Sequence, residues 1–340
     1  MSFIKNRSEI LFMYDVKDAN PNGDPLDENK PRIDEDTGIN LVTDVRLKRT
    51  IRDYLYKYKK QEIFVREIED TEGHIQDAKL RAEDFLTKNG KSLDKSKLEL
   101  IEMKSIIDTN VLDNCIDVRL FGVTLPVEKD KTHKSSITHT GPVQFKIGRS
   151  LHKVFMKHFK GTGAFASGKG AEQKTFREED FLPYSLICFY GIINENVAQE
   201  TKLTEDDVKY LLDGIWNGTK NLISRSKAGQ MPRLLIKINY KESNFHIGDL
   251  NNLVKKASDE IPDSEIRDIS QIPLDITKLI DILQENKEKI LDVDYKVDDR
   301  LVMIYNNEAK NEDKNENGQL ILSLDKCLKD AGIKHNLISF

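Results

Sequence analysis

The stretch EILFMYDVKDANPNGDP, residues 9–25, joins an apolar run to a sharply turning polar loop. The run predicts a buried strand over residues 9–19, because apolar runs bounded by Gly and Pro are typical of core strands. Pro21 restricts the backbone of the loop, and Gly23 permits unusual angles in it. The loop therefore either reverses the chain or holds backbone N–H groups towards a ligand, and the residues that follow it are basic.

The next segment, TDVRLKRTIRDYLYKYKK at residues 43–60, predicts a helix with Thr43 as its N-cap. Apolar side chains at helical spacing form one face of it: Leu47, Ile51, Tyr54, Leu55 and Tyr58. Lys48, Arg52 and Lys59 line one flank of that face, with Arg49 slightly further round. These cations are nearly unopposed along the helix, so the flank suits a bound polyanion. An ordinary solvated face is the alternative.

The rest of the chain mixes strand and helix patterns and predicts an α+β fold. We expect EIFVREI, residues 62–68, to be the next strand and to complete a β-α-β unit, with a helical insertion over residues 70–108. A polar loop without clear periodicity is expected between residues 125 and 141. The other predicted elements are strands at 115–125, 141–151, 182–194 and 231–240, and helices at 204–223 and 275–290.

Charge is unevenly distributed along the 340 residues, which suffice for one large domain or two small ones. The net charge is −5, yet residues 131–170 carry eight Lys and Arg, four of the seven His, and no acid. Residues 241–340 carry 14 cations against 21 acids. A local basic stripe of this kind is typical of proteins that bind polyanions.

Several classes of protein are disfavoured by composition. No apolar run of about 18 residues occurs, so no membrane span is expected. The N-terminal MSFIKNRSEI lacks the apolar core of a secretory signal. Cys115, Cys188 and Cys327 are few and scattered, which fits a reducing cytoplasm and neither a disulfide framework nor a zinc site.

Two further loops are basic. GAFASGKG, residues 163–170, departs from the phosphate loop G-x-x-x-x-G-K-[ST] because Gly170 stands where a hydroxyl is needed, so a nucleotide-dependent switch is disfavoured. A flexible loop with Phe165 and several cations better suits a nucleic-acid backbone or a stacked base. SRSKAGQMPRL, residues 224–234, combines small hydrogen-bonding residues with cations, and suits either phosphates or plain solvent.

Catalytic motifs are weak: H-E-x-x-H, C-x-x-C and G-x-S-x-G do not occur. His133 and His139 have the pKa range for acid–base cleavage of RNA, but we expect solvated or phosphate-facing roles for them. Five acids near the first turn lack the spacing of a Ca²⁺ loop and are expected to cap turns or pair with Arg32 and Arg46: Asp15, Asp18, Asp24, Asp34 and Asp36. No metal and no cofactor are expected.

Residues 18–55, with DANPNGDP, PRIDEDTG and LVTDVRLKRTIRDYL, resemble the signature of the backbone subunits of type I CRISPR Cascade complexes, in the RAMP superfamily. The I-B branch is the most similar, and the I-C branch is also similar. Later blocks of that family follow in the same order, and the resemblance covers about residues 5–240. The blocks are DVRLFGVTL (117–125), GPVQFKIGRSLH (141–152), LPYSLICFYGIIN (182–194) and SRSKAGQMPRLLI (224–236).

The resemblance implies an RRM-like palm, that is, a ferredoxin-like β-α-β-β-α-β core, within residues 1–240. Residues 70–115 would be a helical or finger insertion, and residues 153–183, approximately, a thumb β-hairpin. The acidic residues 241–340 would complete the palm or form a subunit contact.

The resemblance also implies a non-catalytic, cytoplasmic subunit whose copies form a helical filament along one CRISPR RNA. Sequence-independent backbone contacts would present the guide to a target DNA strand, because base pairing reads the target. Its other partners would be the remaining Cascade subunits: a small backbone-capping subunit, a large subunit and a processing endoribonuclease. The alternative is an RNA endonuclease subunit of a type III-like effector complex, which is disfavoured because the expected thumb residues 153–178 contain no Asp.

The RNA-binding residues that the motifs and the resemblance together indicate lie in five groups. They are Asn20, Asn22 and Gly23; Thr43, Arg46, Lys48, Arg49 and Arg52; Gln144, Lys146, Arg149 and Ser150; Phe165 and Lys169; and Arg225, Ser226 and Lys227.

Overall fold

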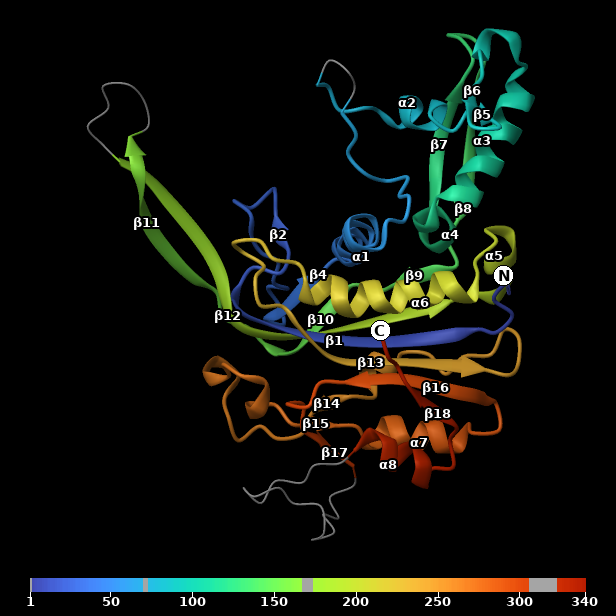
Figure 1. The fold of residues 1–340 in the computed structure, drawn as a ribbon. Helices are drawn as coiled ribbons and strands as arrows, with labels where there is room; N and C mark the ends of the chain where they lie inside the picture. Colours follow the sequence, from blue (N-terminus) through green and yellow to red (C-terminus); the bar gives the residue numbers. More distant parts are fainter. Residues whose placement is uncertain (1, 70–72, 167–173, 306–322) are drawn as a thin grey trace.

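The computed structural model describes residues 2–69, 73–166, 174–305 and 323–340, with only the backbone for 161–166 and 174–177. Among these residues, nine strands form one main sheet (Figure 1). They are β1 (Ser8–Ala19), β4 (Ile39–Val42), β9 (Val143–Phe145), β10 (Gly148–Lys153), β11 (Lys157–Ala166), β12 (Lys174–Ile193), β13 (Met231–Tyr240), β16 (Ile290–Val297) and β18 (His335–Leu337). The order is β18-β16-β13-β1-β12-β10-β4, and β9 and β11 also pair with β12.

Strand β1 is the centre of the sheet, which confirms the strand predicted over residues 9–19. It pairs antiparallel with β12 on one side and with β13 on the other. Alternate side chains enter two different cores, Leu11 and Met13 on one face and Ile10 and Phe12 on the other. A strand buried on both faces needs a continuous apolar run, and the sequence supplies one.

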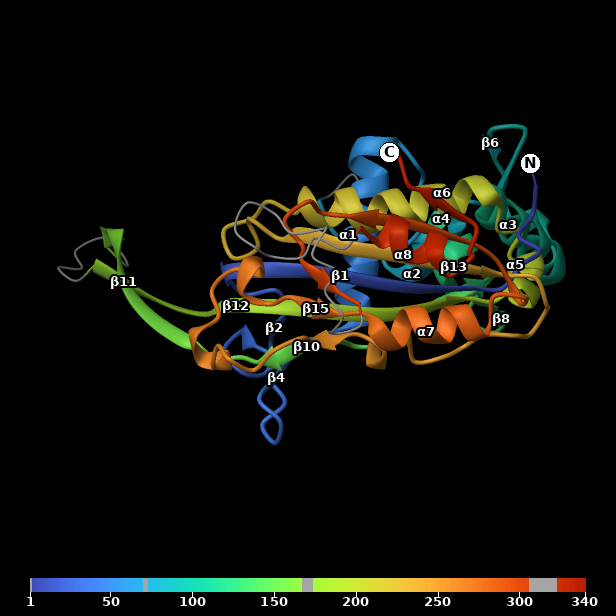
Figure 2. The same ribbon diagram turned by 90° about the horizontal axis from the view of Figure 1, so that it is seen from below.

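Helices cover both faces of the sheet (Figures 1 and 2). Helix α1 (Asp44–Lys59) and helix α6 (Glu205–Asp213) pack on the face of Ile10 and Phe12. Helices α7 (Thr277–Glu285) and α8 (Leu324–Asp330) pack on the opposite face. Helix α1 matches its prediction. Helix α6 continues without a break as a π-helical turn, Gly214–Gly218, and helical residues 219–220, so the predicted helix 204–223 is confirmed except for its last three residues.

An inserted unit, residues 61–140, has a small core of its own. Its elements are α2 (Ala78–Glu83), β5 (Thr87–Lys88), β6 (Lys91–Ser92), α3 (Leu100–Asn114), α4 (Ile116–Phe121), β7 (Gly122–Glu128) and β8 (Lys134–Thr140). The insertion is therefore only partly helical. The expected loop between residues 125 and 141 is largely a hairpin, because β7 and β8 pair along their whole length.

Two predicted strands are wrong. Residues 62–68 form only a single bridge, from Glu62 to Cys115, because the N–H groups of Phe64 and Val65 donate to the side chain of Asp117 instead of a neighbouring strand. Residues 115–125 begin as helix α4, and β7 starts only at Gly122, whose positive φ of 72° allows the change of direction.

The β-α-β-β-α-β order of elements is present in the chain, but the strand that follows α1 in it is β10 and not the predicted strand 62–68. Strand β1, helix α1, strands β10 and β12, helix α6 and strand β13 follow one another, with the inserted unit between α1 and β10. In the sheet the four strands lie in the order β13-β1-β12-β10. The predicted mixture of α and β structure is confirmed.

The strands β11 and β12 leave the sheet together as a long hairpin that projects away from both layers of helices (Figures 1 and 2). Their pairing starts at Lys157 and Phe181 and runs outward. At its base the rings of Phe159 and Phe181 stack, with centroids 5.0 Å apart.

The last hundred residues extend the main sheet through β16, which pairs with β13, and β18. Other short elements are β2 (Gly23–Asp24), β3 (Lys30–Pro31), β14 (Lys255–Lys256), β15 (Leu274–Asp275), β17 (Met303–Ile304) and α5 (Glu195–Glu200), together with four single-turn 3₁₀ helices among the described residues.

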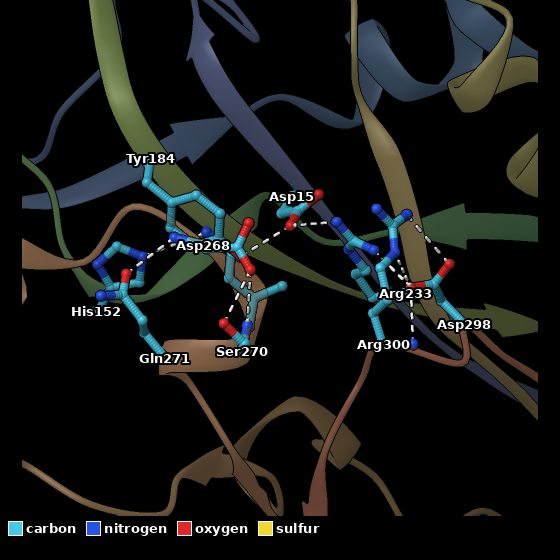
Figure 3. A network of polar contacts seen from close by, with 10 residues as sticks. Asp15, His152, Tyr184, Arg233, Asp268, Ser270, Gln271, Asp298 and Arg300 are labelled. Carbon is cyan, nitrogen blue, oxygen red and sulfur yellow. Dashed lines mark hydrogen bonds and ion pairs between the residues drawn. The ribbon is translucent and has the colours of Figure 1, made fainter. Parts of the chain in front are cut away.

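A buried polar network links this C-terminal part to the central strands (Figure 3). Arg233 donates to Asp15 at 2.8 Å and to Asp298 at 2.5 Å. Tyr184 donates to Asp15 at 2.8 Å, and Arg300 to Asp298 at 3.2 Å. Burial raises the pKa of Asp15, against the effect of Arg233. Arg233 therefore has a structural role, and Asp15 pairs with it instead of with Arg32 or Arg46.

Candidate nucleic-acid interface

The turn after β1 is clamped to the start of helix α1. Asn22 Oδ1 accepts hydrogen bonds from the backbone N–H and the hydroxyl of Thr43, at 2.8 and 2.9 Å. Thr43 is the N-cap, as predicted, and its hydroxyl accepts from the N–H of Arg46 at 3.2 Å. A Cβ on Gly23 would stand 2.1 Å from the side-chain oxygen of Asn29, so only glycine fits there. The turn is thus fixed beside the positive end of the helix dipole.

The loop of residues 224–230 reaches the same corner. The N–H of Asn20 donates to the carbonyl of Ser226 at 2.8 Å, and the Asn20 side chain donates to the carbonyl of Asn29 at 2.7 Å. Asn20 is buried, so its side chain holds the turn in place. The next residue of the loop, Lys227, lies within electrostatic range of Arg46.

Arg46 and Lys227 form a pair of like charges at this corner, which we call the cationic corner. Burial, and then the charge of Arg46, lowers the pKa of Lys227; burial also lowers the pKa of Arg46. Arg46 donates to the Thr50 hydroxyl at 3.0 Å and Lys227 to the Ser226 hydroxyl at 3.3 Å. Within the described residues, neither has a carboxylate at ion-pair distance. Such a pair attracts an anion, since an anion would relieve both charges.

The four cations predicted to line the flank of α1 are already paired, which corrects the expectation that they are nearly unopposed. The ion pairs are Lys48–Asp44 at 3.1 Å, Arg49–Asp53 at 2.9 Å, Arg52–Asp117 at 3.0 Å and Lys59–Asp213 at 2.6 Å. Two of the partners, Asp117 and Asp213, come from other elements. A ligand can therefore contact these cations only through the N–H donors that the ion pairs do not use.

The predicted block 141–152 is divided between surface and core. Gln144, Lys146 and Arg149 are exposed. Lys146 pairs with Asp249 at 2.5 Å, and Arg149 with Asp34 at 3.4 Å, so the basic stripe is less free than its sequence indicates.

Ser150 lies in the core. Its hydroxyl accepts from the N–H of Asn40 at 2.9 Å and donates to the carbonyl of His152 at 2.6 Å. Both bonds are internal to the fold, and the side chain does not reach the surface.

A hollow of about 460 Å³ lies between the turn, the loop 224–230 and the base of the long hairpin. Phe159 and Phe181 line it from the hairpin, and Ser226 lines it from the loop. Arg225, also in the lining, donates to Glu179 of β12 at 2.8 Å. Sequence reasoning missed Phe159, which is 64% exposed, because nothing in the sequence places it beside residue 226.

Two predicted contacts cannot be placed at this hollow. The side chain of Phe165 and all of Lys169 lie outside the described residues. Of the glycine-rich stretch 163–170, the described part belongs to strand β11.

The predicted histidines are not brought together. His133 lies in the turn between β7 and β8, where Nδ1 is 2.9 Å from Asp130. His139 lies six residues further along, about 20 Å for an extended strand, and contacts Asp108. The structure therefore provides no paired acid and base from these two residues.

The expected thumb residues 153–178 contain no Asp, but the pairing of β11 and β12 extends to Phe181 and so includes one aspartate, Asp180. Asp180 is opposite His158, with 2.9 Å between its Oδ1 and the histidine Nδ1. Its side chain is only 9% exposed. This aspartate is thus occupied in holding the two strands together.

In the described ranges, no group of three or more His, Cys, Asp and Glu side chains is arranged to hold a metal ion. No helix in the same ranges has the length and apolar character needed to cross a membrane.

A groove of about 610 Å³ separates α1 from the inserted unit. Arg46, Arg49 and Arg52 line it from the helix side. The opposite wall includes Arg66, Gln76, Arg81 and Thr124, none of which sequence reasoning identified. They lie in segments that the sequence presents as a charged insertion and a strand, and only the fold turns them towards α1.

The chain is similar to several known proteins. The family model described as CRISPR-associated protein Cas7 matches residues 6–277. A Haloferax volcanii protein named CRISPR-associated protein Cas7 is 34% identical over 300 residues, 84% of this chain and 85% of the relative. Two solved structures are also similar, each over 88% of this chain. They are titled CRISPR RNA-guided surveillance complex, pre-nicking (11% identity, TM-score 0.48, 96% of that chain) and CRISPR RNA-guided surveillance complex (12%, 0.45, 94%).

Proposed function

The chain belongs to the CRISPR-associated protein Cas7 family, and from this we propose that it is a non-catalytic, RNA-binding backbone subunit of a type I Cascade complex in the prokaryotic cytoplasm. Its copies polymerise along a CRISPR RNA and present the guide for pairing with target DNA. The I-B branch is the proposed subtype. The other proposed partners are a small backbone-capping subunit, a large subunit and a processing endoribonuclease.

In this proposal, the parts of the fold have the family's roles. The β-α-β-β-α-β order supports an RRM-like palm, the inserted unit is the finger, and the β11–β12 hairpin is the thumb. The C-terminal strands β16 and β18 complete the palm sheet.

The cationic corner is the observation that carries the proposal. Arg46 and Lys227, for which the described part of the chain offers no carboxylate at ion-pair distance, lie near the N-cap of a sixteen-residue helix. Phosphate groups are commonly held by cations, hydroxyls and helix N-termini together. None of these groups reads a base, so the corner suits a guide whose sequence must vary.

The test removes both charges of the corner. In an Arg46→Gln/Lys227→Gln variant, we expect affinity for single-stranded RNA to fall by about tenfold to a hundredfold, with a shallower dependence on salt, because two phosphate contacts are lost. Fluorescence anisotropy with RNAs of unrelated sequence measures this. The matched control is Arg267→Gln/Lys278→Gln, which removes the same charges from exposed sites in the C-terminal part. Equal affinities of the two variants would contradict the proposal.

A further inference from the structure

The groove between α1 and the inserted unit is continuous with the cationic corner. Asn22, Thr43 and Arg46 belong to the corner and also line the groove. From there the groove passes between α1 and the segments 64–67 and 76–78, to the start of strand β7. Figure 1 shows the inserted unit above α1, so the groove has the helix on one side and this unit on the other.

Two arginines of the groove, Arg52 and Arg66, are held in place by contacts that do not use all of their N–H donors. Five lining residues are arginines, against two acids. Arg52 is fixed by the buried Asp117 at 3.0 Å. Arg66 pairs with Glu62 at 3.2 Å, and its guanidinium lies 4.6 Å from the ring centre of Tyr56. A guanidinium has five N–H donors, so each of these contacts leaves others for a ligand.

Three polar atoms of lining residues have no hydrogen-bond partner among the residues that the structure describes. They are Nε of Arg46, Nε of Arg66 and Oε1 of Gln76, all buried. Buried polar atoms in folded proteins nearly always have a hydrogen-bond partner. Arg46, Arg66 and Gln76 therefore hold hydrogen-bonding capacity, unused within the described part of the chain, just beneath the wall of the groove.

The remaining lining suits a sugar–phosphate chain. Thr124 of β7 is exposed and lies directly opposite the exposed Thr138 of β8. Val45 and Val65, 65% and 45% exposed, add apolar surface between the polar groups. Arginine, threonine and glutamine side chains commonly contact phosphates and sugars, and the valines can cover the carbon face of a ribose.

We propose that this groove is a second RNA contact, in which Arg66, Gln76 and Thr124 of the inserted unit hydrogen-bond the sugar–phosphate backbone of the strand that leaves the cationic corner. This inference rests on the proposed function, since it extends the same bound strand. It assigns the inserted unit a direct part in holding RNA.

A charge introduced into the groove tests the inference. Thr124→Glu should weaken binding of single-stranded RNA by about tenfold, the factor that one charge-assisted hydrogen bond contributes. Thr132→Glu is the control, because it adds the same charge at the exposed far end of the same hairpin. Equal affinity of the two variants would overturn the inference. The Arg46→Gln/Lys227→Gln variant separates the two claims: if it binds like wild type, the proposed function fails, and if it alone loses affinity, only the groove fails.

Cross-linking gives a readout that a change in stability does not produce. Thr124→Cys and Thr132→Cys are labelled with a benzophenone maleimide; the native cysteines are buried, and buried thiols react poorly. Irradiation with bound RNA should cross-link the label at residue 124 and not the label at residue 132. Cross-linking of both positions to the same extent, or of neither, would place the strand outside the groove.

Discussion

At the scale of single residues, the cationic corner is a site whose charges oppose folding and favour binding. Lys227 is partly buried beside Arg46, and its pKa is lowered from the ordinary 10.5 by burial and by that neighbour. Its charge therefore destabilises the folded protein at every pH below its folded-state pKa. The effect disappears as the pH rises to 10.5, where the unfolded chain also loses the proton. A bound phosphate would reverse the sign by stabilising both cations.

This argument predicts opposite effects of one substitution on stability and on binding. Lys227→Met should raise the free energy of unfolding at pH 7 by about 0.5 kcal/mol, the scale of partly solvated charge effects, and should weaken RNA binding. The gain should shrink between pH 7 and pH 10. Urea denaturation at both pH values measures it, with the exposed Lys220→Met as the control. A loss of stability at pH 7, or a gain independent of pH, would contradict the prediction.

Sequence reasoning at this scale succeeds where partners are local. The N-cap Thr43 and the pairing of Asp24 with Arg32, eight residues apart, are confirmed. It fails for Arg52, whose partner Asp117 lies 65 residues away on an element predicted to be a strand. The fold decides which cations have an acidic partner, and helical spacing alone does not show it.

At the scale of elements, Asp117 joins three segments. Its buried carboxylate accepts from Arg52 of α1 at 3.0 Å, and from the N–H groups of Phe64 at 2.7 Å and Val65 at 3.1 Å. Residue 117 itself belongs to α4 of the inserted unit. This side chain therefore helps to fix both walls of the groove between α1 and that unit.

We expect Asp117→Asn to lower the free energy of unfolding by about 3 kcal/mol, because it leaves a mostly buried arginine without its carboxylate and puts an amide NH2 against one of the two backbone N–H donors. Urea denaturation measures the loss. Asp113→Asn is a matched control: Asp113 pairs with Lys202 at 3.0 Å at the surface, and its loss should cost less than about 0.5 kcal/mol. Comparable losses in the two variants would show that Asp117 does not join the segments as described.

The failures of strand prediction have the same origin. Residues 115–125 look like a strand because they are apolar, but Ile116 and Leu120 fill the core under α1 while Val118 fills that of the inserted unit. A short helix that lies between two cores has apolar residues on several sides. Its sequence is therefore a short apolar run, which looks the same as that of a buried strand. The long elements, β1, α1, β12 and β13, are predicted well because each has one dominant period or a continuous apolar run.

At the scale of the whole molecule, the long hairpin is the feature that the fold itself does not need. Most of β1, β12 and β13 lies between two helix-covered cores, whereas the outer part of the hairpin projects away from both (Figure 1). An isolated two-stranded ribbon is only marginally stable in water. In the proposed filament, this hairpin reaches the RNA and the next copy of the chain.

Shortening the hairpin should therefore separate folding from assembly. Replacing residues 161–177 with Asn-Gly joins the cross-strand partners Lys160 and Glu178 through a tight turn. We expect the free energy of unfolding to change by no more than about 1 kcal/mol, since neither core is touched. Binding to a short RNA should be retained, while the rise in affinity with RNA length should be lost. Anisotropy with RNAs of increasing length, and sedimentation of the complexes, measure both.

The β7–β8 hairpin provides the matched control, because replacing residues 129–133 with Asn-Gly joins its partners Glu128 and Lys134 in the same way. That variant should keep the length dependence. If both variants keep it, copies of the chain assemble through other surfaces and the hairpin has a different role. If both lose it while binding to a short RNA is retained, the inserted unit contributes as much to assembly as the long hairpin, and the specific role of the long hairpin is contradicted.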